Sequence, residues 1–344
     1  MKILAFESSC DETAVAVVED GRRVLSDAIA SQADLHALYG GVVPELASRK
    51  HVEVIAALTE KALADAHCTR QDIDAVAVTY APGLIGAVLV GLSFAKSMAY
   101  GLGVPLIPVH HVRGHIAANY LAFPELEPPF LALAISGGNT LIVDVRDYTD
   151  LEILGATRDD AAGECFDKVA RLLGFPYPGG PHIDRHGQNG DPHAIKVPMG
   201  LTQGKAGAAH PYDFSFSGVK TAVARWVESE QAAGHEIPVD DVCASLADSV
   251  ATVLARKAMR GCRQYDSNTL IVGGGFSANS QLRAKLLEFG ENYGVDVRIP
   301  QIKLCTDNGA MVAMLGVNLV EAGVAPSAPD FPIDSAMPLT KVSM

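Results

Sequence analysis

The chain has 344 residues, a formal net charge of −13 and 49% hydrophobic residues, which exclude a disordered chain and leave room for two lobes with cores. The acidic balance repels nucleic acid, so an RNA substrate would need a local basic surface or a partner protein. Six scattered cysteines without a C-x-x-C pair argue against a disulfide framework or a zinc knuckle. The apolar run Leu84 to Ala95 is too short to span a bilayer, and the N-terminus lacks a signal-peptide layout. We therefore expect a cytoplasmic protein that makes no membrane contact.

The first predicted elements are two apolar strands, residues 2–6 and 14–19, joined by a polar loop from Glu7 to Thr13. Two such strands with a short connection predict a hairpin. The loop's hydroxyls and backbone N–H groups suit a phosphate, and Asp11 suits a hydrated cation. An ordinary polar turn is the alternative. We assign no catalytic residue and keep Asp11 and Glu12 as supporting candidates.

The next segments alternate between helix and strand. An amphipathic helix is predicted over about residues 46–67, a strand over 72–79, and an apolar helix from the Pro82-Gly83 turn through Lys96. A further strand over 104–109 completes the pattern. This alternation is typical of buried strands with helical crossovers, and it indicates an α/β fold.

A histidine pair follows that last strand. His111 and His115 are four positions apart, so on a helix they lie on one face, where two neutral imidazoles suit a divalent transition metal. A surface histidine pair at a helix start is the alternative. His182 and His186 form a second H-x-x-x-H, a rival metal pair that could equally flank a short exposed helix.

After the Pro-rich segment Pro124 to Pro129, the opening pattern recurs. Strands are predicted over 130–135 and 141–145, with Ser136-Gly137-Gly138-Asn139-Thr140 between them. The repetition indicates an internal duplication, and the glycines expose N–H groups that suit a phosphate. A tight hairpin is the alternative. Farther on, a buried strand over 269–272 leads through a glycine-rich loop to a helix from Ser280, an arrangement that suits a nucleoside or phosphate.

The last motif is Cys305-Thr306-Asp307-Asn308-Gly309, before an apolar helix. Thr306 or Asp307 would make a good N-cap, and Asp307 could alternatively be a third ligand for the histidine pair. Beyond Ala325 the chain is Pro-rich and should wrap as a tail.

Together these segments resemble the bacterial TsaD family, which attaches threonylcarbamoyl to tRNA and was formerly described as O-sialoglycoprotein endopeptidases. The matching motifs run in family order along almost the whole chain: Glu7 to Thr13, Tyr39 to Arg49, His111 to His115, Ser136 to Gly138, Asp160 to Lys168, Tyr177 to Gly180, Asp213 to Thr221, Gly273 to Asn279 and Cys305 to Gly309. Two positions depart from the family pattern, because Asn139 replaces the usual His and Ala81 the usual Gly.

The resemblance implies an α/β fold with two duplicated actin/Hsp70/sugar-kinase-like (ribonuclease H-like) lobes and a nucleotide cleft between them. We expect an N-terminal lobe over residues 1–128, with the first phosphate loop and the histidine pair, and a C-terminal lobe over 129–344. The helix from about residue 307 would pack back on the first lobe. The resemblance also implies one metal, iron or zinc, held by His111, His115 and Asp307, and Mg²⁺ with bound nucleotide.

By the same resemblance, the donor is threonylcarbamoyl-AMP and the acceptor is the exocyclic amine of the adenosine beside the anticodon, in tRNAs reading codons that begin with A. The residues implied to bind the donor are Ala134, Ile135, Ser136, Gly137, Gly138, Asn139, Asp167, Gly180, Asp184 and Asn279. The implied partners are tRNA, a non-catalytic paralogue and a small ATPase.

Three other functions compete with this hypothesis. An ATP-dependent phosphotransferase or ATPase of the same fold would use Asp11 for metal-bound phosphates. A nucleotide-binding scaffold paralogue would lack catalysis, which the histidine pair and Asp307 argue against. A metalloprotease would need the Glu of H-E-x-x-H, and Val112, Arg113 and Gly114 stand between the histidines instead.

Overall fold

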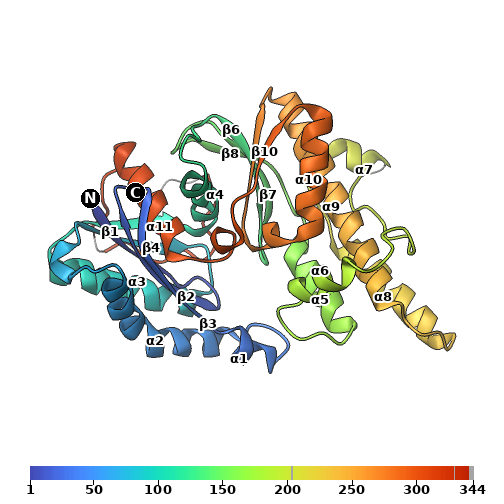
Figure 1. Cartoon of the computed structure of the whole chain (residues 1–344), viewed down its shortest axis with the longest axis horizontal. Coiled ribbons are helices and arrows are strands. Elements are labelled where there is room, and N and C mark those ends of the chain that lie inside the picture. Colours follow the sequence, from blue (N-terminus) through green and yellow to red (C-terminus); the bar gives the residue numbers. More distant parts are fainter. Residues whose placement is uncertain (203, 329, 341–344) are drawn as a thin grey trace. The chain divides into compact units, whose positions relative to one another are not determined.

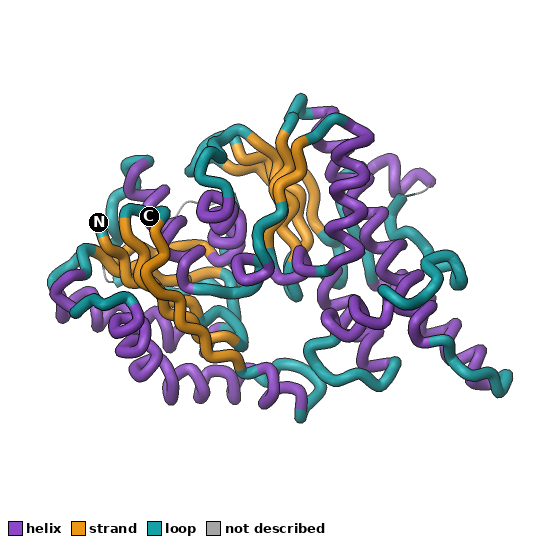
Figure 2. Tube along the Cα trace, in the orientation of Figure 1, coloured by secondary structure: helices purple, strands orange, loops and turns teal. Residues whose placement is uncertain are grey.

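The chain forms two compact units, each built around a five-stranded sheet flanked by helices (Figures 1 and 2). The computed structural model describes residues 1–202, 204–328 and 330–340. Unit 1 contains Met1–Pro128, Arg146–Leu151 and Lys303–Met344, and unit 2 contains Pro129–Val145 and Glu152–Ile302.

The sheet of unit 1 has the strand order β3-β2-β1-β4-β5. Its strands are β1 (Lys2–Glu7), β2 (Glu12–Glu19), β3 (Arg23–Ser31), β4 (Ala75–Ala81) and β5 (Leu106–His110). The hairpin expected from the first two apolar runs is confirmed, since β1 and β2 pair antiparallel with Leu4 opposite Val17. Strand β4 pairs parallel with both β1 and β5. These parallel strands are buried on both faces, which is why their sequences are continuous apolar runs.

Helices cover both faces of this sheet. They are α1 (Ala33–Ala37), α2 (Pro44–Asp65), α3 (Ile85–Leu102), α4 (His111–Ala122) and α11 (Gly309–Glu321), with a short 3-10 helix, η1 (Arg70–Asp72). Leu4 and Phe6 pack in a core cluster with Ile55 of α2 and Leu92 of α3. On the other face, α11 contacts β1 and β2 and also packs against α4. The helix with the histidines is therefore held by a second helix from the end of the sequence.

Helix α3 extends past the apolar run Leu84 to Ala95. At 18 residues and a mean hydropathy of 1.5, it is the one helix of the described chain long and apolar enough to cross a membrane, by length and composition only. It packs against α2 and β4 within unit 1, and core helices of globular proteins pass the same test.

The Pro-rich tail beyond Ala325 packs on unit 1. Phe331 makes an edge-to-face contact with Tyr80, whose ring centroid lies 5.6 Å away. The Met337 carbonyl lies 3.1 Å from Nε2 of His110, and the Leu339 carbonyl accepts a 2.8 Å bond from Nε of Arg113. The tail therefore contacts both the end of β5 and the first turn of α4.

The sheet of unit 2 has the order β10-β9-β6-β7-β8. Its strands are β6 (Phe130–Ile135), β7 (Thr140–Val145), β8 (Leu151–Ala156), β9 (Thr269–Gly273) and β10 (Asp296–Arg298). Strand β6 pairs antiparallel with β7 and parallel with β9, just as β1 pairs with β2 and β4 in unit 1. The repeated sequence pattern therefore corresponds to a repeated strand arrangement.

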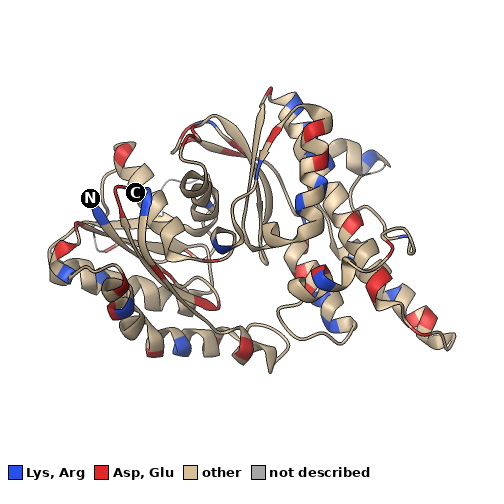
Figure 3. Ribbon diagram, in the orientation of Figure 1, with Lys and Arg blue, Asp and Glu red and all other residues tan. Residues whose placement is uncertain are grey.

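The helices of unit 2 surround an aromatic and aliphatic core. They are α5 (Ala162–Leu172), α6 (Gly180–Gly187), α7 (Gly204–Ala209), α8 (Ser217–Ala232), α9 (Val239–Gln264) and α10 (Ser280–Tyr293), with a short 3-10 helix, η2 (Gly275–Ala278). Another 3-10 helix, η3 (Ile302–Leu304), begins at the last residue of unit 2 and continues into unit 1. The long helix α9 is buried along most of its length between the sheet, α6 and α10. Many of the charged residues lie on the outer helices, and the central strands β4, β6 and β9 carry none (Figure 3).

Candidate metal centre and nucleotide-binding loops

The parallel strands of unit 1 end together, and their ends position the first group of polar residues. Strands β1, β4 and β5 end at Glu7, Ala81 and His110. The loop after β1 packs against the loop before α3, where the N–H of Leu84 donates to the Ser9 carbonyl at 2.8 Å. A Cβ at Gly83 would lie 2.7 Å from that same carbonyl oxygen, so glycine permits this close approach. Helix α4 begins directly after β5, which places its first residue, His111, beside Glu7.

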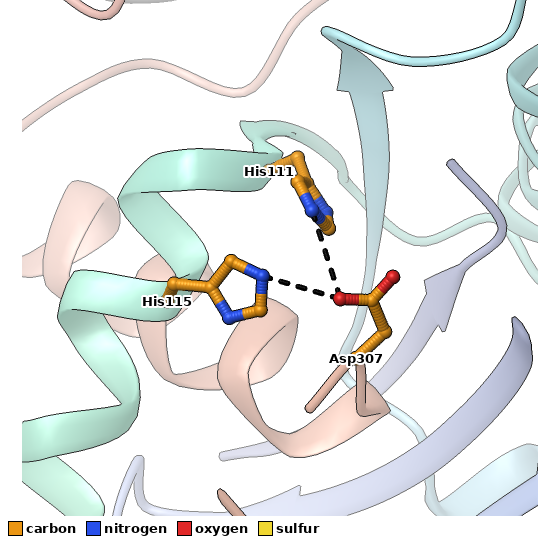
Figure 4. Close-up of side chains that lie close together, drawn as sticks. All are labelled: His111, His115 and Asp307. Atoms are coloured by element: carbon orange, nitrogen blue, oxygen red, sulfur yellow. Dashed lines mark ion pairs between the residues drawn. The ribbon is translucent and has the colours of Figure 1, made fainter. Parts of the chain in front are cut away.

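Three side chains converge at this edge of the sheet (Figure 4). Oδ1 of Asp307 lies 3.2 Å from Nε2 of His115 and 3.7 Å from Nε2 of His111. One potential ligand atom from each residue lies within 4.8 Å of the others. Within the described chain this is the one such group of three or more His, Cys, Asp or Glu side chains. Two imidazoles and a carboxylate are a ligand set suited to a divalent transition metal.

Asp307 is available for this role because neighbouring residues cap the helix. The N-cap of α11 is Asn308, whose side chain accepts a 2.8 Å bond from the N–H of Met311. Asp27 on β3 accepts a 3.0 Å bond from the N–H of Gly309. The expectation that Thr306 or Asp307 caps this helix is therefore wrong, and the Asp307 carboxylate points to the histidines instead.

Glu7 fixes the orientation of His111. The buried Glu7 carboxylate accepts bonds of 2.6 Å from the Ser9 N–H and 2.6 Å from the Thr79 hydroxyl, and lies 3.1 Å from Nδ1 of His111. Because a carboxylate only accepts, Nδ1 of His111 carries a proton, and Nε2 is the nitrogen that faces Asp307. A carboxylate on the outer nitrogen is the usual support for a metal-binding histidine. Sequence reasoning included Glu7 in the loop motif but gave it no role.

His115 carries buried polar atoms without a hydrogen bond. Neither of its ring nitrogens meets hydrogen-bond geometry with a described residue, although its side chain is almost fully buried. Buried polar atoms are normally satisfied, so an unsatisfied imidazole beside a carboxylate needs a further partner. A metal ion between these side chains would satisfy Nε2 of His115, and the residues present therefore fit one.

The electrostatics of the cluster are those of a cation site. Burial by itself would lower the pKa of His111, but the carboxylates of Glu7 and Asp307 have the larger combined effect and raise the pKa to about 9. Burial by itself would raise the pKa of Asp307, but the two histidines have the larger combined effect and lower the pKa to about 2. Burial raises the pKa of Glu12 to about 9, with added repulsion from Asp307 and Asp11. Bringing so many carboxyl groups together favours positive charge among them, from a proton or a metal.

The two supporting catalytic candidates lie beside this cluster. Asp11 is buried, and Glu12 begins β2, where its carboxyl accepts a 3.2 Å bond from the Ser31 hydroxyl. A further residue, which the sequence motifs did not single out, is His51 of α2, which contacts the loop between β1 and β2. Nδ1 of His51 lies 2.7 Å from the Thr13 hydroxyl, and Nε2 lies 2.9 Å from the Cys10 carbonyl.

A sequence signal for His51 does exist. It is four residues from both Ala47 and Ile55, which are buried on α2, so it falls on the apolar stripe of that helix. The Cys10 carbonyl can only accept, so Nε2 of His51 carries the proton, and burial lowers the pKa of this imidazole. A neutral His51 therefore holds the polar loop in place.

In unit 2, the equivalent strand ends carry glycine-rich loops. The loop after β6 is closed by Ser136, whose N–H donates to the Asn139 carbonyl at 2.8 Å and whose hydroxyl accepts the Asn139 N–H at 3.1 Å. A Cβ on Gly137 or Gly138 would meet nothing within 4 Å, so the backbone there is open to a ligand. A Cβ on Gly274, after β9, would lie 2.3 Å from the Ile135 carbonyl oxygen. Glycine thus brings the two loops together.

Two acidic side chains bind backbone N–H groups at the starts of helices in unit 2. Asp167 of α5 accepts a 2.8 Å bond from the Gly179 N–H, just before Gly180 begins α6. Asp184 accepts bonds from the N–H and hydroxyl of Ser280, at 2.9 and 2.8 Å, at the start of α10.

Asn279 is the N-cap of α10, and its side-chain oxygen accepts the Leu282 N–H at 2.8 Å. Its Nδ2 is buried and has no partner among the described residues. The N–H groups of Gly179, Ser280 and Leu282 at these helix starts are therefore already bonded to Asp167, Asp184 and Asn279. Ala134 and Ile135 are the last two residues of β6.

The structure separates the predicted site residues into two groups. His111, His115, Asp307, Asp11 and Glu12 belong to unit 1, and all the predicted donor-binding residues belong to unit 2. The second histidine pair joins neither group. His182 and His186 both stack on Phe175, and Nδ1 of His186 lies 2.6 Å from Asp240. That pair therefore fits its alternative interpretation, two histidines of a short partly exposed helix.

The two repeated sheets with helices on their faces define a protein of the actin-like ATPase and sugar-kinase fold. Among solved structures, a HypF from T. kodakarensis matches with a TM-score of 0.64, at 15% identity, over 93% of this chain and 48% of that one. An activator of 2-hydroxyisocaproyl-CoA dehydratase from Clostridium difficile matches with a TM-score of 0.56, at 11% identity, over 94% of this chain and 97% of that one.

The chain belongs to the tRNA N6-adenosine threonylcarbamoyltransferase family. The TsaD family model matches residues 23–314. A relative with that name from Bifidobacterium longum is 75% identical over 343 residues, covering 99% of each chain. Another from Clostridioides difficile is 48% identical over 313 residues, covering 91% of each. The resemblance inferred from the motifs is thereby confirmed.

Proposed function

We propose that this chain transfers the threonylcarbamoyl group from threonylcarbamoyl-AMP to the exocyclic amine of the adenosine beside the anticodon, in tRNAs reading codons that begin with A. The enzyme class follows from the family. The observation that carries the proposal in the structure is the convergence of His111, His115 and Asp307, within 4.8 Å of one another, in a chain of this family. A scaffold without catalysis would have no need to keep these three side chains together.

The metal ligands in this proposal are His111 and His115 of α4 and Asp307 before α11. The ion would be iron or zinc, since both accept imidazole and carboxylate ligands. A divalent ion held there supplies positive charge for the carbamoyl oxygen of the donor. Glu7 keeps His111 in the tautomer that leaves Nε2 free for this purpose.

The loops of unit 2 bind the adenylate in this proposal. The open backbone of Ser136, Gly137 and Gly138 contacts its phosphate, assisted by Asn139 and by the end of β6 at Ala134 and Ile135. A second set of residues contacts the nucleoside: Asp167, Gly180, Asp184 and Asn279. Two observations support this assignment. The Cβ directions of Gly137, Gly138 and Gly180 meet nothing within 4 Å, and the buried Nδ2 of Asn279 has no partner among the described residues.

The chemical step is an acyl transfer. The adenosine N6 nitrogen forms a bond to the carbamoyl carbon, the bond from that carbon to the phosphate oxygen breaks, and AMP leaves with the electron pair. The amine loses one proton, which passes to solvent or to AMP. Much of the rate acceleration comes from binding the amine and the carbamoyl group close together in a reactive orientation, because an aryl amine is a weak nucleophile. We assign no general base, and Asp11 and Glu12 remain supporting candidates beside the metal ligands.

The partners in this proposal are tRNA, a non-catalytic paralogue and a small ATPase, with the reaction in the cytoplasm and Mg²⁺ accompanying nucleotide. Because the chain has a net charge of −13, a partner that adds basic surface would increase its affinity for tRNA.

The test is reconstitution with purified components. The chain would be incubated with threonine, bicarbonate, ATP, tRNA, an adenylate-forming enzyme and the proposed partners, and digested tRNA would be analysed by mass. We expect threonylcarbamoyladenosine with the parent chain, and loss of both bound metal and product with His111→Ala. Replacing the exposed His67 with Ala should change neither. Full modification by metal-free protein would refute the metal assignment, and ATP turnover without tRNA or product would favour the ATPase alternative.

A further inference from the structure

A row of arginines on α9 contrasts with the acidic character of the chain. Arg256, Arg260 and Arg263 are spaced by four and three residues, so they lie on one face of the helix. All three are exposed. With Gln264 and with Tyr293 at the end of α10 they line a surface hollow of about 480 Å³. We call this surface the arginine row.

The charges of the arginine row are not neutralised within the protein. Within the described residues, none of the three guanidinium groups forms an ion pair with a carboxylate. Arg256 contacts Sδ of Met199 at 3.4 Å, and the guanidinium of Arg260 lies 5.9 Å from the ring centre of Tyr212. Most arginine donors are therefore free, although the chain has 40 Asp and Glu residues against 27 Lys and Arg.

The surroundings hold this surface in shape. The hydroxyl of Tyr212 donates to Gln264 at 2.7 Å, and its ring makes an edge contact with Tyr265. Beneath them, the buried Lys257 hydrogen-bonds to main-chain carbonyls, including that of Leu201 at 2.9 Å. Side chains positioned before binding lose less entropy when a ligand arrives.

The arginine row lies away from the proposed adenylate loops. Tyr293 is at the opposite end of α10 from Asn279, and a helix of 14 residues is about 20 Å long. A single nucleotide cannot reach both places, so a ligand that contacts both must be extended. The row itself is about 10 Å long, which corresponds to two or three phosphates along one nucleic-acid strand.

The chemistry favours RNA over other anions. Guanidinium groups bind phosphate oxygens with paired hydrogen bonds. Tyr293 is 48% exposed and stacks on Phe289 with a ring-centre distance of 6.0 Å, so it presents an aromatic ring beside the arginines. Aromatic rings next to arginines are typical of surfaces that bind nucleic acid.

We propose that the arginine row is a tRNA-binding surface, which contacts the phosphate backbone at a distance from the reacting adenosine. This inference rests on the proposed function for the identity of the RNA. It assigns Arg256, Arg260 and Arg263 to positioning of the substrate, with no part in the acyl transfer.

The experiment measures binding of unmodified tRNA to the full chain, with its proposed partners present, at several salt concentrations. Each Arg→Gln change should reduce the slope of log Kd against log salt by up to about one, and the triple change should weaken binding at least tenfold at low salt. The triple Arg→Lys variant should retain most of the slope. The control is the pair Arg171→Gln and Arg225→Gln, two other exposed arginines of unit 2.

Two further measurements make the outcome decisive. The triple Gln variant should keep its circular dichroism spectrum and its affinity for an adenylate analogue, while its KM for tRNA rises and its kcat stays. Unchanged salt dependence of tRNA binding, or an equal loss in the control pair, would overturn the inference even if the parent chain modifies tRNA. If the parent bound tRNA through these arginines but did not modify it, the inference would stand and the proposed function would fail.

Discussion

The carboxylate of Glu7 lies 3.1 Å from Nδ1 of His111, and this contact sets which nitrogen of the imidazole faces Asp307. Glu7 is the last residue of β1, and His111 begins α4 directly after β5. Because β4 lies between β1 and β5 in the sheet, the contact joins the ends of two strands that do not pair with each other. The orientation of a proposed metal ligand therefore depends on a residue that is not itself in the proposed ligand set.

The first prediction concerns that contact. Glu7→Gln keeps the size of the side chain but removes its charge, and its amide can turn a donor toward His111. We expect metal affinity to fall by roughly 10- to 100-fold, the usual effect of losing such a support. Competition with a coloured chelator would measure it. Glu53→Gln, an exposed change on α2, is the control, and equal affinities in parent and Glu7→Gln protein would contradict the role of Glu7.

The second prediction concerns pH. Burial raises the pKa of Asp27 to about 6, against the lowering effect of the N–H groups of Gly309 and Ala310. Between about pH 4 and pH 6 the folded state thus binds more protons than the unfolded state, so the free energy of unfolding falls as pH rises through this window. Asp27→Asn keeps the acceptor oxygen and does not titrate.

We therefore expect the stability of Asp27→Asn relative to the parent to increase by about 1–2 kcal/mol between pH 4 and pH 7. Urea unfolding of both proteins at the two pH values measures this difference, because every other titrating group is shared. A relative stability that decreases with pH would show that the charged carboxylate is favoured at this helix start.

The third prediction concerns the approach of α11 to the sheet. A Cβ on Gly309 would lie 2.6 Å from the backbone nitrogen of Ala16, so an added methyl group must displace the start of the helix. We expect Gly309→Ala to destabilise the fold by roughly 1–3 kcal/mol and to weaken metal binding, because Asp307 is two residues away. Thermal unfolding and metal titration would test both effects.

Gly101→Ala is the matched control for that change. Gly101 is also helical, on α3, and a Cβ there would meet nothing within 4 Å. It should leave metal binding unchanged and stability equal or slightly higher, since alanine is the better helix former. Metal binding that survives Gly309→Ala undiminished would mean that Asp307 does not depend on this packing.

The fourth prediction separates two roles of Asn279. Asn279→Ser retains an N-cap oxygen for α10 but lacks the Nδ2 donor, whereas Asn279→Ala loses both. We expect Asn279→Ser to leave the free energy of unfolding unchanged and to weaken binding of an adenylate analogue by about 2- to 10-fold. Asn279→Ala should weaken binding in the same way and also lower the free energy of unfolding by about 1 kcal/mol. Calorimetric titration and thermal unfolding measure the two effects, and unchanged affinity in both variants would exclude Asn279 from the nucleotide site.

Much of the fold could be predicted from local pattern. The strands β1 and β6 are unbroken apolar runs that end in small polar residues, and their repetition indicated the two similar sheets. Strand β3, by contrast, was not anticipated, because Arg23–Ser31 lies at an edge and has few buried residues. The ends of helices were also approximate, since the helix predicted over about residues 46–67 is α2, Pro44–Asp65.

The candidate site was predictable only in part, for a physical reason. The spacing of His111 and His115 gives a shared helix face, but nothing local distinguishes Asp307 as a ligand from Asp307 as an N-cap. That distinction depends on Asn308 and Asp27, which together satisfy the start of α11. Glu7 and His51 act through tertiary contacts between segments far apart in the sequence, which periodicity does not reveal.

The division of the chain has a consequence for the order of biosynthesis. Unit 1 is built mainly from Met1–Pro128 and Lys303–Met344, and all of unit 2 lies between these two segments in the sequence. A ribosome therefore completes the whole of unit 2 before it makes Asp307 and α11. The early strands and the histidine helix must wait for that last segment with part of their apolar surface exposed. Loading of a metal at His111, His115 and Asp307 would then be one of the final events in maturation of a newly made chain.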